Sequence, residues 1–222
     1  MIKAVIFDYD GTLSDRLANA YYIFKDYFKP YFKDFTDIEY EAALQDLLTY
    51  DCNGTCPVEL RMQMFVHKYG DHFKQEDIEP FKQFYYEYMW KYSNLKPGMR
   101  ELLTKLKGQY KLAILSNGSS KSQHYKINHC NIDEFFDEIV VSGDYGINKP
   151  DKRIFEMTAE KLGVKCEECV FVGDVFASDI LGASRANMIP VWYVGDHERP
   201  ATYDGFRITY MDELLKVLEK LK

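Results

Sequence analysis

The chain has 222 residues, 46% of them hydrophobic and 28% charged, which is typical of a folded globular protein and excludes a disordered or fibrous chain. Its net charge is −7, and no segment concentrates lysine and arginine, so neither a nucleic acid nor an anionic membrane is expected as a partner. The sequence contains no run of about 18 apolar residues, so no transmembrane helix is predicted. The N-terminus lacks a signal-peptide pattern, so a cytoplasmic protein is expected.

Short apolar runs alternate with amphipathic helix patterns in two parts of the sequence, residues 1–13 and 97–222. In the helix patterns, apolar residues recur at intervals of three and four, as they do from Met99 to Leu106. The predicted strands cover residues 4–8, 111–116, 139–142, 170–174, 189–194 and 206–209. Because strands that alternate with helices form a parallel sheet covered on both faces, we expect an α/β fold with a doubly wound parallel sheet and a Rossmann-like core.

A segment without any strand pattern, residues 16–94, lies between these two parts. Four helices are predicted in it, at residues 16–33, 37–50, 57–70 and 76–92. Pro30 should kink or end the first helix, and a capping-box pattern at Thr36 marks the start of the second. We therefore expect two domains, an α/β core of residues 1–15 and 95–222 and an inserted helical bundle.

Polar residues gather where four predicted strands end, and ligands of open parallel sheets bind beyond these carboxyl ends. They are Asp8 and Asp10 after the first strand, Ser116, Asn117 and Gly118 after the second, Lys149 after the third, and Asp174 and Asp179 after the fourth. Four carboxylates in one cleft repel each other strongly unless a cation lies among them. Because the set offers oxygen ligands and no histidine or cysteine, it favours Mg²⁺ over zinc. With Mg²⁺ and the lysine in place, the site can accept a dianionic phosphate.

Each of these motifs also has a purely structural explanation. Gly11 can supply the positive φ of a turn, and Asp10 can cap that turn. Asp174 and Asp179 can cap helices in the same way. The motifs are not independent, however, because all four lie at ends of predicted strands in the order that a phosphate site requires. We therefore interpret them as one site for phosphate and metal.

Four stretches of the sequence resemble, in order, the four motifs of the haloacid-dehalogenase-like hydrolases. They are Asp-Tyr-Asp-Gly-Thr-Leu at residues 8–13, Ser-Asn-Gly at 116–118, Lys-Pro-Asp at 149–151, and Gly-Asp with a following Ser-Asp at 173–179. The first motif is very specific and the last is fairly specific. The resemblance covers the whole chain, and it implies that residues 16–94 correspond to the helical cap of this superfamily and the remainder to its catalytic core.

The resemblance implies a phosphatase that works through an aspartyl-phosphate intermediate. Asp8 would be the nucleophile, since a carboxylate is already ionised at neutral pH and needs no base to activate it. Asp10 would protonate the leaving alcohol and then take a proton from the hydrolytic water. The expected activity is therefore the hydrolysis of a phosphomonoester.

The same resemblance implies how phosphate and metal are bound. The phosphate would be held by the N-terminus of the following helix and by Ser116, Asn117 and Gly118. Lys149 would offset charge on the nucleophile and the phosphoryl group. The Mg²⁺ ligands would be the carboxylates of Asp8 and Asp174, the backbone carbonyl of Asp10 and, directly or as an outer residue, Asp179.

The positions next to the motifs favour a phosphatase within this superfamily. Members that cleave carbon–halogen or carbon–phosphorus bonds lack an acid at the position of Asp10. Sugar phosphomutases with this type of cap typically have glutamate at the position of Gly173. The alternatives are such a phosphomutase, or a non-hydrolytic phospho-acceptor or binding module comparable with response-regulator receiver domains, which lack a helical insertion.

The helical segment is rich in aromatic residues, and the whole chain has 18 Tyr and 15 Phe. Most of these side chains should pack the interior of the bundle, while a minority could stack on a flat substrate group. Residues 116–118 and 178–183 resemble the branch that contains pyrimidine 5′-nucleotidases, and phosphoglycolate-type phosphatases share much of both stretches. We therefore expect a small phosphorylated metabolite as the substrate, with a nucleoside 5′-monophosphate as the first candidate.

Overall fold

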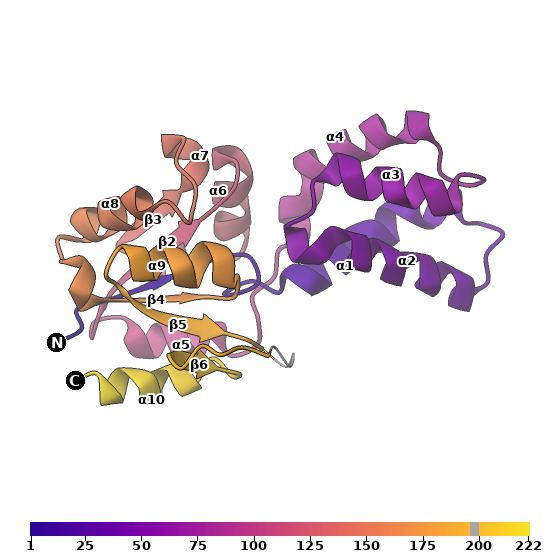
Figure 1. The fold of residues 1–222 in the computed structure, drawn as a ribbon. Coiled ribbons are helices and arrows are strands. Elements are labelled where there is room, and N and C mark those ends of the chain that lie inside the picture. The colour runs from indigo at the N-terminus through magenta and orange to yellow at the C-terminus, as the bar shows by residue number, and fades with distance from the viewer. Residues whose placement is uncertain (196–199) are drawn as a thin grey trace. The chain divides into compact units, whose positions relative to one another are not determined.

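The computed structural model describes residues 1–195 and 200–222, and the chain divides into two compact units (Figure 1). The α/β unit comprises residues 1–14 and 95–222, and the helical unit comprises residues 15–94. Asp15, which was expected in the α/β core, belongs to the helical unit, where its side chain accepts a hydrogen bond from the amide of Ala18 (3.1 Å) and caps the first helix. Within the described ranges, no helix has the length and apolar character needed to cross a membrane.

The α/β unit is built on a parallel sheet whose strands lie in the order β3-β2-β1-β4-β5-β6. The strands are β1 (Ala4–Phe7), β2 (Lys111–Ser116), β3 (Glu138–Val141), β4 (Cys169–Gly173), β5 (Ile189–Tyr193) and β6 (Phe206–Ile208). All are within one residue of their predicted bounds, and the predicted fold class is confirmed. The inner strand β1 sends Val5 and Phe7 into the core on one face and Ala4 and Ile6 into the core on the other. Because side chains of a strand alternate between faces, the sheet is buried on both sides.

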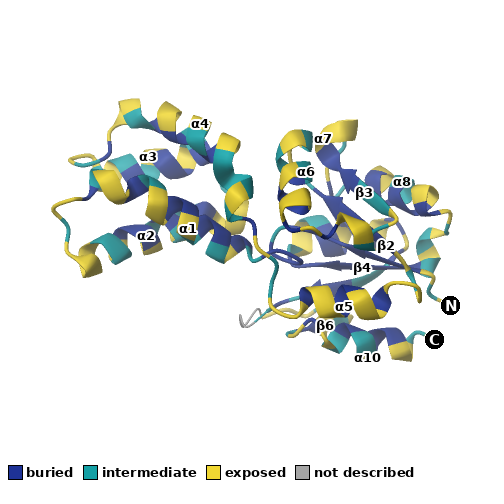
Figure 2. Ribbon diagram, turned by 180° about the vertical axis from the view of Figure 1, so that it is seen from behind, coloured by how far each residue is buried: buried dark blue, intermediate teal, exposed yellow. Residues whose placement is uncertain are grey.

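Helices cover both faces of this sheet, and Figure 2 shows the buried strands between helices with exposed outer faces. The helices are α5 (Met99–Leu106), α6 (Ser120–His129), α7 (Ser142–Tyr145), α8 (Lys152–Leu162), α9 (Leu181–Arg185) and α10 (Glu213–Lys220). Apolar side chains of α5 and α10 pack in the core of one face, and those of α8 and α9 pack in the core of the other. This arrangement leaves the carboxyl ends of the strands at one edge of the sheet, where their loops carry the predicted site residues.

The helical unit, all of whose residues are described, contains the four predicted helices. They are α1 (Arg16–Phe28), α2 (Asp37–Asp51), α3 (Val58–Tyr69) and α4 (Ile78–Tyr88), with 3₁₀ turns η1 (Lys29–Tyr31), η2 (Cys52–Gly54), η3 (Gln75–Asp77) and η4 (Met89–Tyr92). Pro30 lies in η1, so α1 ends before it, as predicted. The predicted capping box is also present: the Thr36 hydroxyl accepts from the Glu39 amide (3.3 Å), and the Glu39 carboxylate accepts from the Thr36 amide (2.8 Å).

A buried charge cluster joins three helices of this unit. Nη2 of Arg16 lies 3.0 Å from Oδ1 of Asp51 and donates to the hydroxyl of Tyr85 (3.0 Å). Arg61 forms an ion pair with the same oxygen of Asp51, and its guanidinium lies 4.5 Å from the centre of the Tyr85 ring. Asp51 and Arg61 are each 1% exposed. Asp51 is therefore the counter-charge of two buried guanidinium groups.

We expect Asp51→Ala to destabilise the helical unit by about 3–5 kcal/mol, because removing one partner of a buried ion pair leaves uncompensated charge. Urea unfolding followed by circular dichroism measures the change. The matched control is Glu79→Ala, whose carboxylate is 64% exposed beside Lys82, and which should leave the midpoint almost unchanged. Equal midpoints for the two variants would show that the cluster around Asp51 does not stabilise the fold.

Candidate active site

Three carboxylates meet at the carboxyl edge of the sheet. Asp8 directly follows β1 and Asp174 directly follows β4, and these strands are paired, with Phe7 opposite Val172. One carboxylate oxygen from each of Asp8, Asp174 and Asp179 lies within 4.8 Å of the other two. All three residues are buried. The structure thus brings together three of the four predicted carboxylates.

Asp179 reaches this group from a π-helical turn, η7 (Phe176–Ile180), which follows Asp174. Such turns are rare in proteins as a whole, and those that occur are often found at functional sites. The amide of Val175 donates to Oδ2 of Asp179 (2.9 Å), and the Ser178 hydroxyl donates to Oδ1 (3.2 Å). A Cβ atom at Gly173 would lie only 2.5 Å from the Asp179 side chain. The close approach of Asp179 to β4 therefore requires glycine at this position.

Lys149 is the cation of the cluster. Its Nζ lies 2.7 Å from Oδ1 of Asp8 and 2.8 Å from Oδ1 of Asp179, and the side chain is buried. The side-chain amide of Asn117 holds the lysine in place, because its Nδ2 donates to the Lys149 carbonyl (3.0 Å) and its Oδ1 accepts from the Lys149 amide (2.8 Å). The side chain of Asn117, a predicted phosphate-binding residue, thus binds the backbone of Lys149.

The four ionisable side chains of this cluster carry more negative than positive charge when all are ionised. Three carboxylates face one ammonium group, which leaves a net charge of −2 in a buried site. Burial raises the pKa of Asp8 well above its ordinary value, and Asp179 and Asp174 act in the same direction against the effect of Lys149. Burial lowers the pKa of Lys149, but Asp179 and Asp8 outweigh this effect and raise it. The all-oxygen donor set and the charge deficit fit a divalent cation such as Mg²⁺.

The side chain of Asp10 turns to α6. Its Oδ2 lies 2.5 Å from Nζ of Lys126 and accepts a hydrogen bond from Nε2 of Gln123 (2.8 Å). The Ser14 hydroxyl lies 3.5 Å from its Oδ1. The fourth predicted carboxylate, Asp10, thus pairs with a buried lysine and is not part of the cluster that Asp8, Asp174 and Asp179 form. The predicted role of the Asp10 carbonyl as a metal ligand does not depend on this side chain.

The segment after β2 lies beside Asp10. Ser116 is buried at the end of β2, and its hydroxyl accepts a hydrogen bond from Nε2 of Gln123 (3.0 Å). The Gly118 amide, which was expected to bind phosphate, donates to the Ser142 hydroxyl (3.0 Å). Ser116, which was predicted to bind phosphate, is thus linked to Asp10 through the side-chain amide of Gln123.

The loop after β1 folds back onto Asp174. Gly11 has a φ of +87°, and a Cβ atom there would lie 2.6 Å from Oδ2 of Asp174. The Thr12 hydroxyl donates to Oδ1 of the same carboxylate (3.2 Å). Gly11 and Thr12 of the first motif therefore hold Asp174 against Asp8, in addition to forming a turn.

Residues 2–187 match the sequence model of the family described as haloacid dehalogenase-like hydrolase. This span contains all the residues of the site. The chain belongs to this family. The family resemblance inferred from the four motifs is confirmed, and the chain is placed among hydrolases and not among receiver domains.

Two relatives of this haloacid dehalogenase-like hydrolase that match nearly the whole chain are named as phosphatases. A glyceraldehyde 3-phosphate phosphatase of Pyrococcus furiosus is 28% identical over 229 residues, which cover 99% of this chain and 94% of that protein. The pyrimidine 5′-nucleotidase YjjG of Escherichia coli is 29% identical over 224 residues, which cover 98% and 96% of the two chains. The chain is accordingly a phosphoric monoester hydrolase of this family.

The fold has a close match among solved structures. The HAD hydrolase YfnB from Bacillus subtilis, solved bound to magnesium, has a TM-score of 0.77 and 24% sequence identity, and the match covers 98% of each chain. This likeness shows the fold. It also shows that a protein of this fold binds magnesium.

Gln123 and Lys126 are the site residues that the sequence analysis missed. Both belong to α6, which begins four residues after Ser116. Glutamine and lysine side chains on a largely polar helix normally point to solvent. Gln123 and Lys126, however, are only 3% and 4% exposed. Their spacing of three residues places both on one face of the helix, and this was the one signal available in the sequence.

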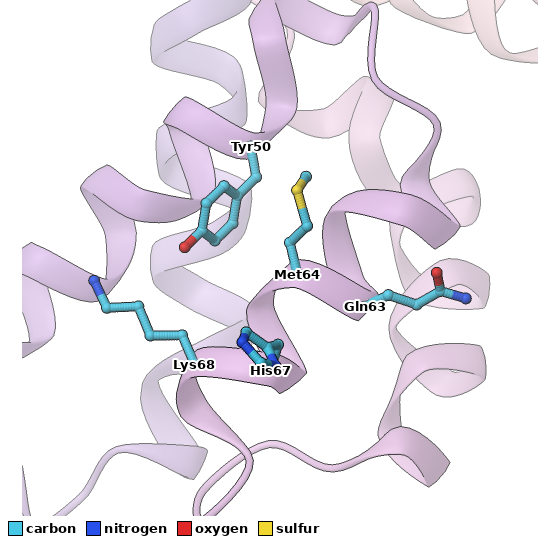
Figure 3. A pocket seen from close by; sticks show the side chains of 5 residues that line it. All are labelled: Tyr50, Gln63, Met64, His67 and Lys68. Atoms are coloured by element: carbon cyan, nitrogen blue, oxygen red, sulfur yellow. The ribbon is translucent and has the colours of Figure 1, made fainter.

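The helical unit has a pocket of its own, of about 660 Å³ (Figure 3). Tyr50 of α2 and four residues of α3 line it, Gln63, Met64, His67 and Lys68. Its charged member, Lys68, is paired with Asp46 (2.5 Å). The pocket offers no acidic group to a metal, and it has no counterpart of the carboxylate cluster in the α/β unit.

Proposed function

We propose that this chain is a Mg²⁺-dependent phosphomonoester hydrolase that acts through an aspartyl-phosphate intermediate on Asp8. The observation that carries the proposal is the buried cluster of Asp8, Asp174 and Asp179 with Lys149, whose net charge of −2 calls for a divalent cation. Residues 1–14 and 95–222 supply the catalytic core. Residues 15–94 are proposed to act as the cap that selects the substrate.

Asp8 and Asp174 would hold Mg²⁺ with their carboxylates, and Asp10 would hold it with its backbone carbonyl. When bound, Mg²⁺ neutralises charge on the phosphoryl group as a Lewis acid. Both oxygens of Asp179 already accept hydrogen bonds or an ion pair, from Val175, Ser178 and Lys149. We therefore propose that Asp179 acts as an outer residue that fixes Lys149 and the loop after β4.

The reaction would proceed in two displacements at phosphorus. In the first, a carboxylate oxygen of Asp8 attacks phosphorus, the bond to the ester oxygen breaks, and Asp10 gives a proton to the leaving alcohol. In the second, Asp10 takes a proton from water, the resulting nucleophile attacks the same phosphorus, and Asp8 leaves as a carboxylate. Ser116 and the N-terminus of α6 would bind phosphoryl oxygens, and Lys149 would hold Asp8 in place.

Gly173 supports phosphatase activity over phosphomutase activity. Sugar phosphomutases with this type of cap typically have a glutamate at this position. A Cβ atom at residue 173 would lie 2.5 Å from the Asp179 side chain, so a glutamate could enter only if Asp179 moved. The loop after β4 is therefore built without the carboxylate that the phosphomutases carry.

The proposed substrates are phosphomonoesters of small metabolites, and two classes compete. A nucleoside 5′-monophosphate is supported by the relative named as a pyrimidine 5′-nucleotidase, and a triose phosphate by the relatives named as glyceraldehyde 3-phosphate phosphatases. The aromatic side chains of the helical unit do not favour a nucleotide over a triose phosphate. Most of them pack in the interior of the unit, as Phe28 does against Phe65 and Phe73.

The substrate test compares kcat/KM for UMP, dTMP, glyceraldehyde 3-phosphate, phosphoglycolate and sugar phosphates in the presence of Mg²⁺. We expect a nucleoside monophosphate or a triose phosphate to exceed the others by more than about tenfold, which corresponds to about 1.4 kcal/mol of transition-state preference. A hexose or pentose phosphate, or phosphoglycolate, that wins by that margin would contradict both candidate classes. Failure to hydrolyse any phosphomonoester would contradict the function itself.

A further inference from the structure

We propose that Gln123 and Lys126 of α6 are positioning residues for Asp10, which hold its carboxyl group where it exchanges a proton with the leaving alcohol. This inference rests on the proposed function, in which Asp10 is the acid–base group. It adds two residues of α6 to a reaction otherwise assigned to the loops after the strands. The contacts of Asp10, of Gln123 and of Lys126 each support it.

Two donors from successive turns of α6 converge on one oxygen of Asp10. Nζ of Lys126 lies 2.5 Å and Nε2 of Gln123 lies 2.8 Å from Oδ2. Once Asp10 has given its proton to the alcohol, the first contact is an ion pair and the second a hydrogen bond to a charged acceptor, the two stronger classes of polar contact. Because aspartate has only two side-chain torsions, two donors on one oxygen fix the direction of the carboxyl group.

The amide of Gln123 joins Asp10 to the segment proposed to bind phosphate. Its Nε2 also lies within hydrogen-bonding distance of Oγ of Ser116 (3.0 Å) and of the backbone carbonyl of Asn117 (2.7 Å), so its two N–H groups are shared among three oxygens. All three partners accept hydrogen bonds, so they fix which end of the amide faces them. A Cβ atom at Gly118 would lie 2.8 Å from this same Nε2. The absence of a side chain at Gly118 thus makes room for Gln123.

Lys126 is held in the interior by its neighbours. The hydroxyl of Tyr9, between Asp8 and Asp10, donates to the Lys126 carbonyl (3.1 Å), and the Lys126 ammonium lies 5.7 Å from the centre of the Tyr9 ring. A buried ammonium is costly without a counter-charge, and Asp10 supplies it. The first motif and α6 are therefore tied together at two points, one through backbone and one through charge.

The position of an acid matters most when the leaving group is poor. A general acid contributes about 10²–10⁴-fold to such a step, and misplacing a reacting group by about 1 Å can cost on the order of 10²-fold. A good leaving group departs without a proton and does not need the acid. Loss of positioning should therefore slow the cleavage of a poor leaving group selectively, whereas a general loss of structure should slow all substrates alike.

The test uses the full chain with Mg²⁺ and two esters of similar shape, phenyl phosphate and p-nitrophenyl phosphate. We compare kcat/KM, which reports the steps up to release of the first product. For Lys126→Met and for Gln123→Met, we expect kcat/KM for phenyl phosphate to fall about 10–100-fold while that for p-nitrophenyl phosphate falls less than about threefold. Asp10→Asn is the reference and should show the same selectivity with a larger loss, of about 10²–10⁴-fold.

Lys105→Met is the matched control, because Lys105 is an exposed lysine on another helix of the α/β unit, α5, outside the proposed site. It should leave both esters unchanged. Suppose that Asp10→Asn keeps its selectivity, while the α6 variants lose activity equally on both esters or lose none. That result would overturn the positioning role and leave the proposed function standing. Absence of selectivity in Asp10→Asn would overturn the acid–base assignment and the positioning role with it. Two independent α6 variants guard against one that fails to fold.

Discussion

Asp8→Asn should lower kcat by about 10⁶-fold, the order of magnitude that the loss of a nucleophile costs in other covalent enzymes. An amide does not attack phosphorus, and it is a poor ligand for Mg²⁺. The change is nearly isosteric, so the fold should persist. The measurement is steady-state release of phosphate from p-nitrophenyl phosphate, with circular dichroism to confirm that the variant is folded.

The control for Asp8→Asn is the same substitution at an exposed residue of the α/β unit, Asp133→Asn. This variant should keep wild-type activity. Burial raises the pKa of Asp8 well above its ordinary value, which means that the ionised carboxylate is unfavourable in this site. The neutral amide of Asn removes that cost, so the variant should fold. Folded Asp8→Asn protein with activity within tenfold of the wild type would show that another residue attacks phosphorus.

Removal of the metal should lower activity by about 10³-fold or more, since a Lewis acid supplies several kcal/mol to such a step. We expect EDTA to abolish turnover and Mg²⁺ to restore it. Ca²⁺ should inhibit, because it takes a larger and looser shell of oxygen ligands than Mg²⁺ does. Asp174→Ala should behave like the chelated enzyme at any ordinary concentration of Mg²⁺.

The dependence on Mg²⁺ should also change with pH. Because burial raises the pKa of Asp8, a proton competes with the cation for this carboxylate as the pH falls. The half-saturating concentration of Mg²⁺ should therefore rise on acidification. Asp133→Asn, a change at an exposed carboxylate of the α/β unit, should not alter that concentration. Full activity after exhaustive chelation would contradict the metal site.

The fold could be predicted because its signals are local. Buried parallel strands are continuous apolar runs, such as Ala4–Phe7, and their order along the chain with helices between them implies the sheet. The end of α1 followed from Pro30, whose ring cannot continue a helix. Helices and the 3₁₀ turns beside them merged in the prediction, because the two share a similar pattern of apolar residues.

The candidate site could be predicted where residues end strands. Asp8, Ser116 and Asp174 lie at strand ends, and Lys149 follows the third strand, so topology alone assembles them. What could not be predicted is which partner each side chain selects. The choice of the Asp10 carboxylate between the metal site and Lys126 depends on contacts between segments that are 116 residues apart.

The most direct test of the central claim traps the intermediate. Asp10→Asn protein is mixed with p-nitrophenyl phosphate and Mg²⁺, then quenched in acid and mapped by mass spectrometry. This substrate needs no acid to leave, whereas the attack of water does need the base that the variant lacks. We predict a burst of one equivalent of p-nitrophenol and a phosphoryl group on Asp8. A burst with the phosphoryl group on another residue, or turnover without any phosphorylated protein, would contradict the account.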